Sequence, residues 1–397
     1  MEFFLLLNTE FSPWPSFSAD EINAVKNVLL SNKVNYWTGT ECLNFEKEFA
    51  NYCDTSYAVA LSNGSVALEL ALKSLGTGPG DEVIVTPRTF VASVSSIVLV
   101  GATPVFVDLE KDSQNISIES IKSAITSKTS AIICVHLAGW PCEMDSIMEL
   151  ADSYGISVIE DCAQAHGAKY KGRPVGSIGH VSTWSFCQDK ILTTGGEGGM
   201  ITTNNEKIWK NIWSYKDHGK SYEAVNKPKK SNGFQWLHES IGSNYRMTEM
   251  QGAIGRIQLR KLTLWNDSRR ENAESILTTC KQFPSLLRIA EPPSYIQSAW
   301  YKCYVFVRPE GLKDDWSRDK IIEEINSHGV PCYSGACPEV YLEKAFIKRG
   351  LNPRKRLVVA KELGETSLMF LIHPTLTSVE IGKTCKIISK VMRLASI

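Results

Sequence analysis

Lys190 carries the strongest chemical signal in the chain. It lies between a strand-like run that ends at Phe186 and the glycine-rich segment Gly195–Gly199. This pattern places one primary amine at a tight backbone bend, beside small polar residues that suit an anionic ligand. An amine held in this way can form a Schiff base with an aldehyde cofactor. A lysine taken alone is usually a solvated surface residue, so the assignment depends on the other motifs of the chain.

Two further segments have the composition of ligand-binding loops. Ser62–Leu68 is a turn of small residues that opens directly into a helical pattern, and the free N–H groups at a helix start favour a phosphate. Asp161 follows the apolar run Val158–Ile159, which predicts a carboxylate at a strand end. Such a carboxylate can keep the nitrogen of a pyridinium ring protonated. Taken singly, each segment is also typical of ordinary helix N-cap chemistry.

Strand-like and helix-like patterns alternate between about residue 55 and residue 205. Apolar runs cover 83–85, 105–107, 131–135 and 156–159, and helical candidates cover 65–75, 118–125 and 146–154. This alternation predicts an α/β fold with a mainly parallel sheet covered on both faces. Because ligands bind such sheets at the carboxyl ends of the strands, Asp108, His136 and Asp161 are candidate site residues.

The pattern changes after about residue 265. Helices are predicted over 243–260, through 274, over 317–327 and at the end of the chain, with a strand over 304–307. We therefore expect a large domain over residues 1–265 and a small C-terminal α+β domain over residues 266–397. The polar segment Lys216–Ser231 is expected to be an exposed loop.

Composition excludes several classes of partner. The 397 residues contain 43 Lys plus Arg and 43 Asp plus Glu, a net charge of zero that predicts no nucleic-acid or membrane partner. An anionic substrate must then be held by local groups.

Cysteine usage and apolar runs bear on the compartment. The eleven cysteines lack CxxC spacing, which favours free thiols in a reducing cytoplasm, although a disulfide or metal site at Cys332 and Cys337 stays an alternative. No histidine has a partner at metal-ligand spacing, so no metal is expected. The apolar segment Phe3–Leu7 lacks the features of a signal peptide, and no apolar run has the length of a bilayer span. We therefore expect a cytoplasmic protein.

Seven segments of the chain occur in an order that is specific when taken together. They are 62–68, 87–93, 135–141, 160–168, the block around Lys190, 243–251 and 373–376. In this order they resemble the DegT/DnrJ/EryC1/StrS family of pyridoxal-phosphate nucleotide-sugar aminotransferases. The resemblance implies the fold-type-I architecture, a pyridoxal or pyridoxamine 5′-phosphate cofactor, and a homodimer with active sites at the subunit interface.

The resemblance also implies a role for each matching residue. Lys190 would bind the cofactor covalently and move protons, and Asp161 would pair with the pyridinium nitrogen. Further cofactor contacts would come from Gln164 near the phenolic oxygen, Phe90 on the ring, Gly64, Ser65 and Ser185 at the phosphate, and Asn244 of the partner subunit at the same phosphate.

The residues that face the sugar are less well defined. Candidates for substrate contact are Arg88, His136, Trp140, His328 and Tyr333, and core packing is the alternative for each of them. The chain departs from the family pattern at Cys187, where a histidine is frequent, and at Arg88, where threonine or tyrosine is commoner. The glycine run that follows Lys190 also has one more glycine than expected.

Similarity to perosamine- and viosamine-type synthases at 190–194 and 329–334 predicts the reaction. L-Glutamate would aminate a 4-keto-6-deoxyhexose on a dTDP or GDP carrier, giving a 4-amino-4,6-dideoxy sugar for surface polysaccharide. A 3-keto or UDP-linked substrate stays open. The alternative enzyme class is a pyridoxal-phosphate sugar lyase or dehydratase on the same scaffold, but the family's dehydratases replace the lysine with histidine. A non-catalytic cofactor-binding sensor is disfavoured by the intact lysine, aspartate and phosphate loop.

Overall fold

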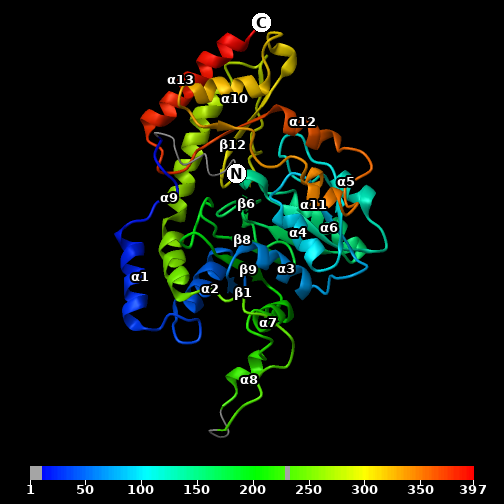
Figure 1. Cartoon of the computed structure of the whole chain (residues 1–397), viewed down its shortest axis with the longest axis vertical. Coiled ribbons are helices and arrows are strands. Elements are labelled where there is room, and N and C mark those ends of the chain that lie inside the picture. Colours follow the sequence, from blue (N-terminus) through cyan, green and yellow to red (C-terminus); the bar gives the residue numbers. More distant parts are fainter. Residues whose placement is uncertain (1–10, 229–232) are drawn as a thin grey trace.

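The computed structural model describes residues 11–228 and 233–397 (Figure 1). The apolar segment Phe3–Leu7 and the end of the polar segment at residues 229–231 lie outside this part of the chain. All eleven cysteines lie within it and are free thiols. No helix in the described ranges is both long and apolar enough to cross a membrane.

A seven-stranded sheet forms the centre of the large domain. Its strands are β1 (Tyr57–Leu61), β2 (Glu82–Val85), β3 (Thr103–Phe106), β4 (Thr129–Val135), β5 (Ser157–Asp161), β8 (Val181–Ser185) and β9 (Gly199–Thr203). Their order across the sheet is β1-β9-β8-β5-β4-β2-β3. The pairs among β8, β5, β4, β2 and β3 are parallel, whereas β9 runs antiparallel to both of its neighbours. The predicted α/β class and mainly parallel sheet are confirmed.

Helices cover both faces of this sheet. They are α2 (Glu41–Tyr52), α3 (Gly64–Ser74), α4 (Ala92–Leu99), α5 (Ile118–Ala124), α6 (Met144–Tyr154) and α7 (Glu206–Tyr215), together with the start of the long helix α9 (Glu249–Cys280), on which α1 (Ala19–Ser31) packs. One buried cluster joins α3, α4 and α7 to one face, and other clusters join α5 and α6, and α2 with α9, to the opposite face. The helices predicted over 65–75, 118–125 and 146–154 are present, with shifts of one or two residues at their ends.

The long helix α9 (Glu249–Cys280) links the large domain to the small one (Figure 1). The helix predicted from Ser243 is wrong in its first six residues. Thr248 caps α9 through a capping box with Gln251, and the preceding backbone pairs instead with neighbouring loops, as in the bond from the Ser243 N–H to the Tyr215 carbonyl. The expected domain boundary after residue 265 falls inside this continuous helix.

The small domain is built on an antiparallel sheet in the order β10-β12-β14-β13. These strands are β10 (Leu287–Arg288), β12 (Cys303–Val307), β14 (Ser367–Phe370) and β13 (Cys332–Tyr333). The helices α10 (Arg318–Ser327) and α13 (Ser378–Ala395) pack on it with the end of α9, and α11 (Lys344–Ile347) and α12 (Val358–Thr366) lie nearer the large domain. The strand predicted over 304–307 and the helix predicted over 317–327 are confirmed, with Ser317 serving as the N-cap of α10.

Two small features complete the fold. A three-stranded sheet of β11 (Ile296–Gln297), β6 (Lys169–Tyr170) and β7 (Arg173–Pro174) joins the chain after α9 to the large domain. The segment after α7 was expected to be a loop, but it contains the short helix α8 (Tyr222–Asn226) within an arm that projects from the large domain (Figure 1). Trp236 on this arm is 88% exposed.

Candidate active site

The carboxyl ends of β1, β2, β5 and β8 bring the sequence-predicted cofactor residues to one edge of the large sheet. Gly64 and Ser65 follow β1, and Phe90 follows β2. Asp161 ends β5, and Ser185 ends β8 five residues before Lys190. This is the edge at which a mainly parallel sheet binds its ligands.

Gly64 lies against Ser185 at the start of α3. A Cβ atom added at Gly64 would lie 2.7 Å from the Cβ of Ser185, and a Cβ at Gly199 would clash with the carbonyl of Asn63. The Asn63 side chain accepts the Val66 N–H at 3.0 Å, so it caps the helix, which begins beside the exposed Ser65. The first N–H groups of an α-helix have no acceptor within the helix. Two residues predicted to hold a phosphate are thus adjacent at a helix N-terminus, which favours an anion.

The Asp161 carboxylate is buried and oriented by two donors. The Ser93 hydroxyl donates to Oδ2 at 2.8 Å, and the Ala163 N–H donates to Oδ1 at 3.1 Å. Thr89 continues the chain, with its hydroxyl 2.8 Å from that of Ser93. Burial raises the pKa of Asp161, while the Ser93 hydroxyl, the Ala163 amide and the charge of Lys190 oppose that rise. Sequence reasoning missed Thr89 and Ser93 as orienting residues, although their spacing of four within one matching segment is a usable signal.

Lys190 is held by its neighbour Asp189 and by residues from two distant parts of the chain. Its Nζ lies 3.8 Å from Oδ1 of Asp189 and 5.3 Å from the ring centre of Tyr301. The Tyr301 hydroxyl donates to Oδ2 of Asp189, and the Trp14 indole N–H donates to the Lys190 carbonyl at 2.9 Å. Burial works against ionisation of Asp189, but the charges of Lys190 and Lys302 and the Tyr301 hydroxyl bring its pKa below the ordinary value. No local pattern connects Trp14 or Tyr301 to Lys190, so their contacts with this residue could not be predicted from the sequence.

Gln164 and Phe90 are available to a ligand at this edge. The Gln164 side-chain oxygen accepts the Ala138 N–H at 2.8 Å, which leaves its NH₂ group as the donor. Phe90 follows β2 at the same edge of the sheet, and its side chain is 64% exposed. Asn244 is also exposed, next to Tyr245, whose carbonyl accepts the Ser62 N–H at 2.9 Å.

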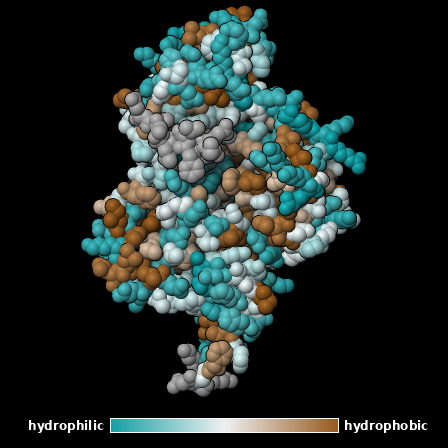
Figure 2. Space-filling model, in the orientation of Figure 1, coloured by the Kyte–Doolittle hydropathy of each residue, from teal (hydrophilic) through white to brown (hydrophobic). Residues whose placement is uncertain are grey.

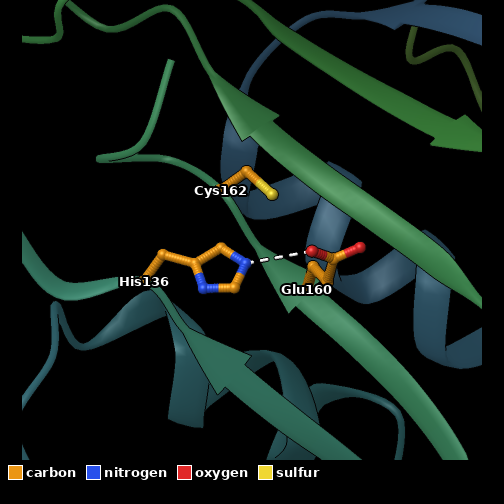
Figure 3. Close-up of side chains that lie close together, drawn as sticks. All are labelled: His136, Glu160 and Cys162. Carbon is orange, nitrogen blue, oxygen red and sulfur yellow. Dashed lines mark hydrogen bonds and ion pairs between the residues drawn. The ribbon is translucent and has the colours of Figure 1, made fainter. Parts of the chain in front are cut away.

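His136 does not lie at the substrate side of the site. Its ring is fully buried, with Nδ1 accepting the Cys142 N–H at 3.0 Å, so Nε2 carries the proton and donates to Glu160 at 3.1 Å (Figure 3). Both ring nitrogens are therefore occupied by the protein. The expectation that His136 contacts the sugar is replaced by a structural role.

The Glu160 carboxylate is the centre of a hydrogen-bond network at the end of β5. Its carboxylate accepts hydrogen bonds from the N–H groups of Gly176, Ile178 and Gly179, from the Ser182 hydroxyl and from His136. Burial opposes ionisation, but these donors, led by His136, bring the pKa of Glu160 below its ordinary value. Cys162 lies beside the pair, and the three side chains have a spacing that a metal ion can accept (Figure 3). Because the carboxylate is already saturated and burial raises the pKa of the Cys162 thiol, we assign the group a structural role.

The other substrate candidates separate into two groups. Arg88, Trp140 and Tyr333 lie where the two domains meet: Arg88 bonds Ser367 of β14, Trp140 lines a pocket with residues of the small domain, and Tyr333 belongs to β13. His328 lies elsewhere, because its ring nitrogens contact Glu324 and Lys390 on the surface formed by α10 and α13.

The geometry fits pyridoxal 5′-phosphate. The start of α3, which the absence of a side chain at Gly64 brings against Ser185, suits its phosphate, the buried Asp161 suits its ring nitrogen, and the half-buried amine of Lys190 suits its aldehyde. A mainly parallel sheet with these groups at one edge, joined by a long helix to a small α+β domain, defines a pyridoxal-phosphate enzyme of the aminotransferase type.

Comparison with known proteins identifies the family. The DegT/DnrJ/EryC1/StrS aminotransferase family model matches residues 15–389, so the chain belongs to this family. An aminotransferase structure from Psychrobacter cryohalolentis is 57% identical, with a TM-score of 0.96 over 97% of this chain and 99% of that one. GDP-perosamine synthase of Escherichia coli O157:H7 is 37% identical over 85% of this chain and 91% of its own. The dTDP-3-amino-3,4,6-trideoxy-alpha-D-glucose transaminase of Streptomyces venezuelae is 35% identical over 81% and 79%.

These matches make the protein a pyridoxal-phosphate-dependent aminotransferase of nucleotide sugars.

The contact between Gly64 and Ser185 gives a test of the phosphate site. We expect Gly64→Ala to weaken binding of pyridoxal 5′-phosphate by the apoenzyme about tenfold or more, because the new methyl group displaces the loop that carries the N–H donors. Titration of the apoenzyme by fluorescence measures the affinity. Gly382→Ala is the matched control, since a Cβ at this α13 position meets nothing within 4 Å. Equal affinity of the Gly64 variant and the wild type would remove the phosphate from this loop.

Proposed function

We propose that this enzyme transfers the amino group of L-glutamate to a nucleotide-linked 4-keto-6-deoxyhexose, giving a 4-amino-4,6-dideoxy sugar for surface polysaccharide. The observation that carries the reaction class is Lys190, a half-buried amine beside the buried carboxylate of Asp161 and the phosphate loop. Similarity to a GDP-perosamine synthase supports the choice of sugar. A relative of nearly equal identity has a name that specifies dTDP and a 3-amino group, so carrier and carbon are proposals that need a direct test.

The protein's own groups perform three tasks in this reaction. Lys190 Nζ would take a proton from the α-carbon of the amino donor and return it to the aldehyde carbon of the cofactor, and in the second half it would reverse this transfer on the sugar. Asp161 keeps a negative charge facing the ring nitrogen, and the free NH₂ of Gln164 donates toward the phenolic oxygen. When bound, the cofactor supplies an electron-poor ring that makes the proton of the donor carbon acidic.

Asp189 and Tyr301 keep Lys190 in reach of this task. The Asp189 carboxylate, held by the Tyr301 hydroxyl, attracts the ammonium form of Lys190 on one side, and the Tyr301 ring faces it on another. The Trp14 indole fixes the backbone at the same residue. The long side chain of Lys190 therefore extends from a fixed backbone position, and the contacts around its amine limit the range over which that amine moves as a proton carrier.

The eleven free thiols support a cytoplasmic location, where such side chains stay reduced.

Removal of the Lys190 amine tests the catalytic assignment. We expect Lys190→Ala to retain the cofactor's phosphate contacts, to lose the absorbance near about 390–430 nm that a lysine-bound cofactor gives, and to lose turnover. Borohydride treatment followed by mass spectrometry reports whether the cofactor is fixed to the chain. Lys386→Ala, an exposed change on α13, is the control and keeps both signals. Wild-type transamination by the Lys190 variant would refute the role.

A substrate panel tests the proposed reaction against its rivals. We expect release of 2-oxoglutarate from L-glutamate in proportion to amino sugar, with a 4-keto-6-deoxyhexose on GDP or dTDP as the best acceptor. The panel includes a 3-keto sugar and a UDP-linked sugar, and both products are measured by mass spectrometry. A lyase or dehydratase would release ammonia or water without consuming glutamate, and a sensor would show no turnover. Preference for a 3-keto or UDP-linked acceptor would correct the proposed substrate and leave the enzyme class intact.

We also propose that two copies of the chain form a homodimer that shares its active sites. An apolar surface supports an interface: Ile22 and Leu30 of α1 are 65% and 69% exposed, and Leu264 of the adjacent α9 is 71% exposed. Figure 2 shows apolar residues gathered over α1. Isolated apolar side chains are normal on a surface, but a group of this size along two packed helices favours contact with protein. In this arrangement Asn244 donates to the phosphate in the partner subunit.

Mixed dimers test whether Asn244 acts across the interface. Asn244→Asp places a negative charge beside the phosphate, so we expect weak cofactor binding in that variant and no turnover in Lys190→Ala. If Asn244 acts in the partner's site, unfolding and refolding the two variants together restores about a quarter of the sites, because each mixed dimer contains one site with both native residues. The activity of the mixture at limiting cofactor is the measurement. No recovery, with mixed dimers verified by affinity tags, would place Asn244 in the site of its own chain.

A further inference from the structure

A pocket between the two domains contains a lysine without an acidic partner. We call it the Lys302 pocket; it is lined by Gln114, Ala138, Trp140, Trp300, Lys302 and Tyr304, among others. The first three residues belong to loops of the large domain, and the last three lie at or near β12 of the small domain. The pocket therefore combines aromatic and apolar side chains with several polar ones, among them Gln114 and Lys302.

Lys302 is the cationic group that lines this pocket. Within the described ranges, its Nζ makes no salt bridge within 4.0 Å and no hydrogen bond, and its nearest aromatic contact is the Tyr301 ring at 4.9 Å. Asp112 also lines the pocket, but its carboxylate is paired with Arg288. The ammonium group of Lys302 therefore has three N–H donors to offer to a ligand. A half-buried ammonium keeps its charge most easily when a hydrogen-bond acceptor faces it.

Arg88 places a second unpaired positive charge behind the same wall. Its guanidinium is fully buried, donates from Nε to Gln114 at 2.9 Å and from Nη2 to Ser367 at 3.1 Å, and leaves Nη1 without a partner. No carboxylate within 4.0 Å balances it among the described residues, and the Tyr304 ring lies 5.4 Å away. Contact with an aromatic ring offsets only part of the cost of burying a charge. Gln114 and Tyr304 thus line the pocket while they hold this arginine.

The Lys302 pocket adjoins the reactive lysine through shared residues. Ala138 lines the pocket, donates its N–H to Gln164 and accepts the Tyr301 N–H at 2.9 Å. Tyr301, next to Lys302 in sequence, bonds Asp189 beneath Lys190. A ligand in the pocket therefore lies one residue away from the groups that orient the cofactor.

We propose that the Lys302 pocket binds an acidic oxygen group of a substrate, with Lys302 in direct contact and Arg88 as a positioning residue behind Gln114. This inference rests on the proposed function, which supplies two sources of such a group: a carboxylate of the amino donor and the diphosphate of the nucleotide. In a chain of zero net charge, two cations that have no carboxylate within 4.0 Å among the described residues give this pocket the local attraction that an anionic substrate needs.

The protonation of Lys302 gives the proposal a second, independent consequence. Burial, together with the charges of Arg269 and Lys190 and against that of Asp189, lowers the pKa of Lys302 to about 8. The ammonium form that attracts an anion is therefore present at neutral pH and is lost as the pH rises through that value. Asp112 at the pocket is a further charged group near Lys302, and His373 is a titratable neighbour whose own pKa is lowered to about 3, first by burial and then by the charges of Arg269 and Lys302.

Binding without turnover tests the pocket directly. We expect Lys302→Met, which keeps the length of the side chain, to weaken binding of one or both of two probes about tenfold or more: a nucleoside diphosphate (GDP, dTDP and UDP in turn) and the dicarboxylate glutarate. Isothermal titration of the holoenzyme measures both affinities, with Lys386→Met as the control of equal charge change. Loss for the diphosphate assigns the nucleotide, loss for glutarate assigns the amino donor, and loss for both assigns a cation used in each half of the reaction.

Two further arms separate a binding role from damage to the fold. Wild-type affinity is expected to fall as the pH rises from about 7 to about 8.5, and Lys302→Met is expected to lose this slope. Arg88→Gln is expected to weaken the same probe, and Arg88→Lys to restore most of its affinity at an unchanged melting temperature. Unchanged affinities for both probes in Lys302→Met would overturn the proposal. Because no step requires turnover, a failure of the proposed sugar reaction leaves this result readable on its own.

Discussion

The close approach of two backbone segments across β9 is the constraint on which the site depends. The loops after β1 and β8 lie on either side of this single antiparallel strand, and they meet only because Gly64 and Gly199 have no side chain. Their contact brings a helix N-terminus next to the segment that leads to Lys190. Without it, the phosphate-binding end and the covalent end of the cofactor would have no fixed separation. The helix start supplies the donors, but the glycines set the distance.

A second buried arrangement fixes the opposite side of the site. Glu160 and Asp161 are consecutive residues with different surroundings. The Glu160 carboxylate accepts hydrogen bonds from five donors of the protein, whereas the Asp161 carboxylate accepts fewer and can still accept one from a ligand. The neutral tautomer of His136 contributes a hydrogen bond without a counter-charge. The structural carboxylate therefore stabilises the end of β5, while the functional one projects from it. This division explains why His136, which follows a strand in the manner of a site residue, has no role in substrate contact.

The sequence was sufficient for the groups that act locally. The strand–helix alternation predicted the sheet and placed Asp161 at a strand end, and the matched segments identified Gly64 and Lys190, because each of these signals depends on neighbours in the chain. Contacts between residues far apart in the sequence could not be predicted. Examples are the bond from Trp14 to Lys190, the bond from Tyr301 to Asp189 and the bond from Arg88 to Ser367. The helix predicted from Ser243 failed for a related reason: backbone pairing with Tyr215 and Lys216 outweighed helical propensity, and the cap at Thr248 decided the start.

The continuous helix α9 has a mechanical consequence. At 32 residues it extends for about 48 Å, and it passes from the core under Phe45 to the core of the small domain without a flexible joint. Movement of one domain relative to the other must then bend α9 or slide it against its neighbours. Either change requires more free energy than rotation about a loop. We therefore expect the separation of the two domains to change little when a ligand binds between them, so that recognition depends on the shape of the surfaces they present.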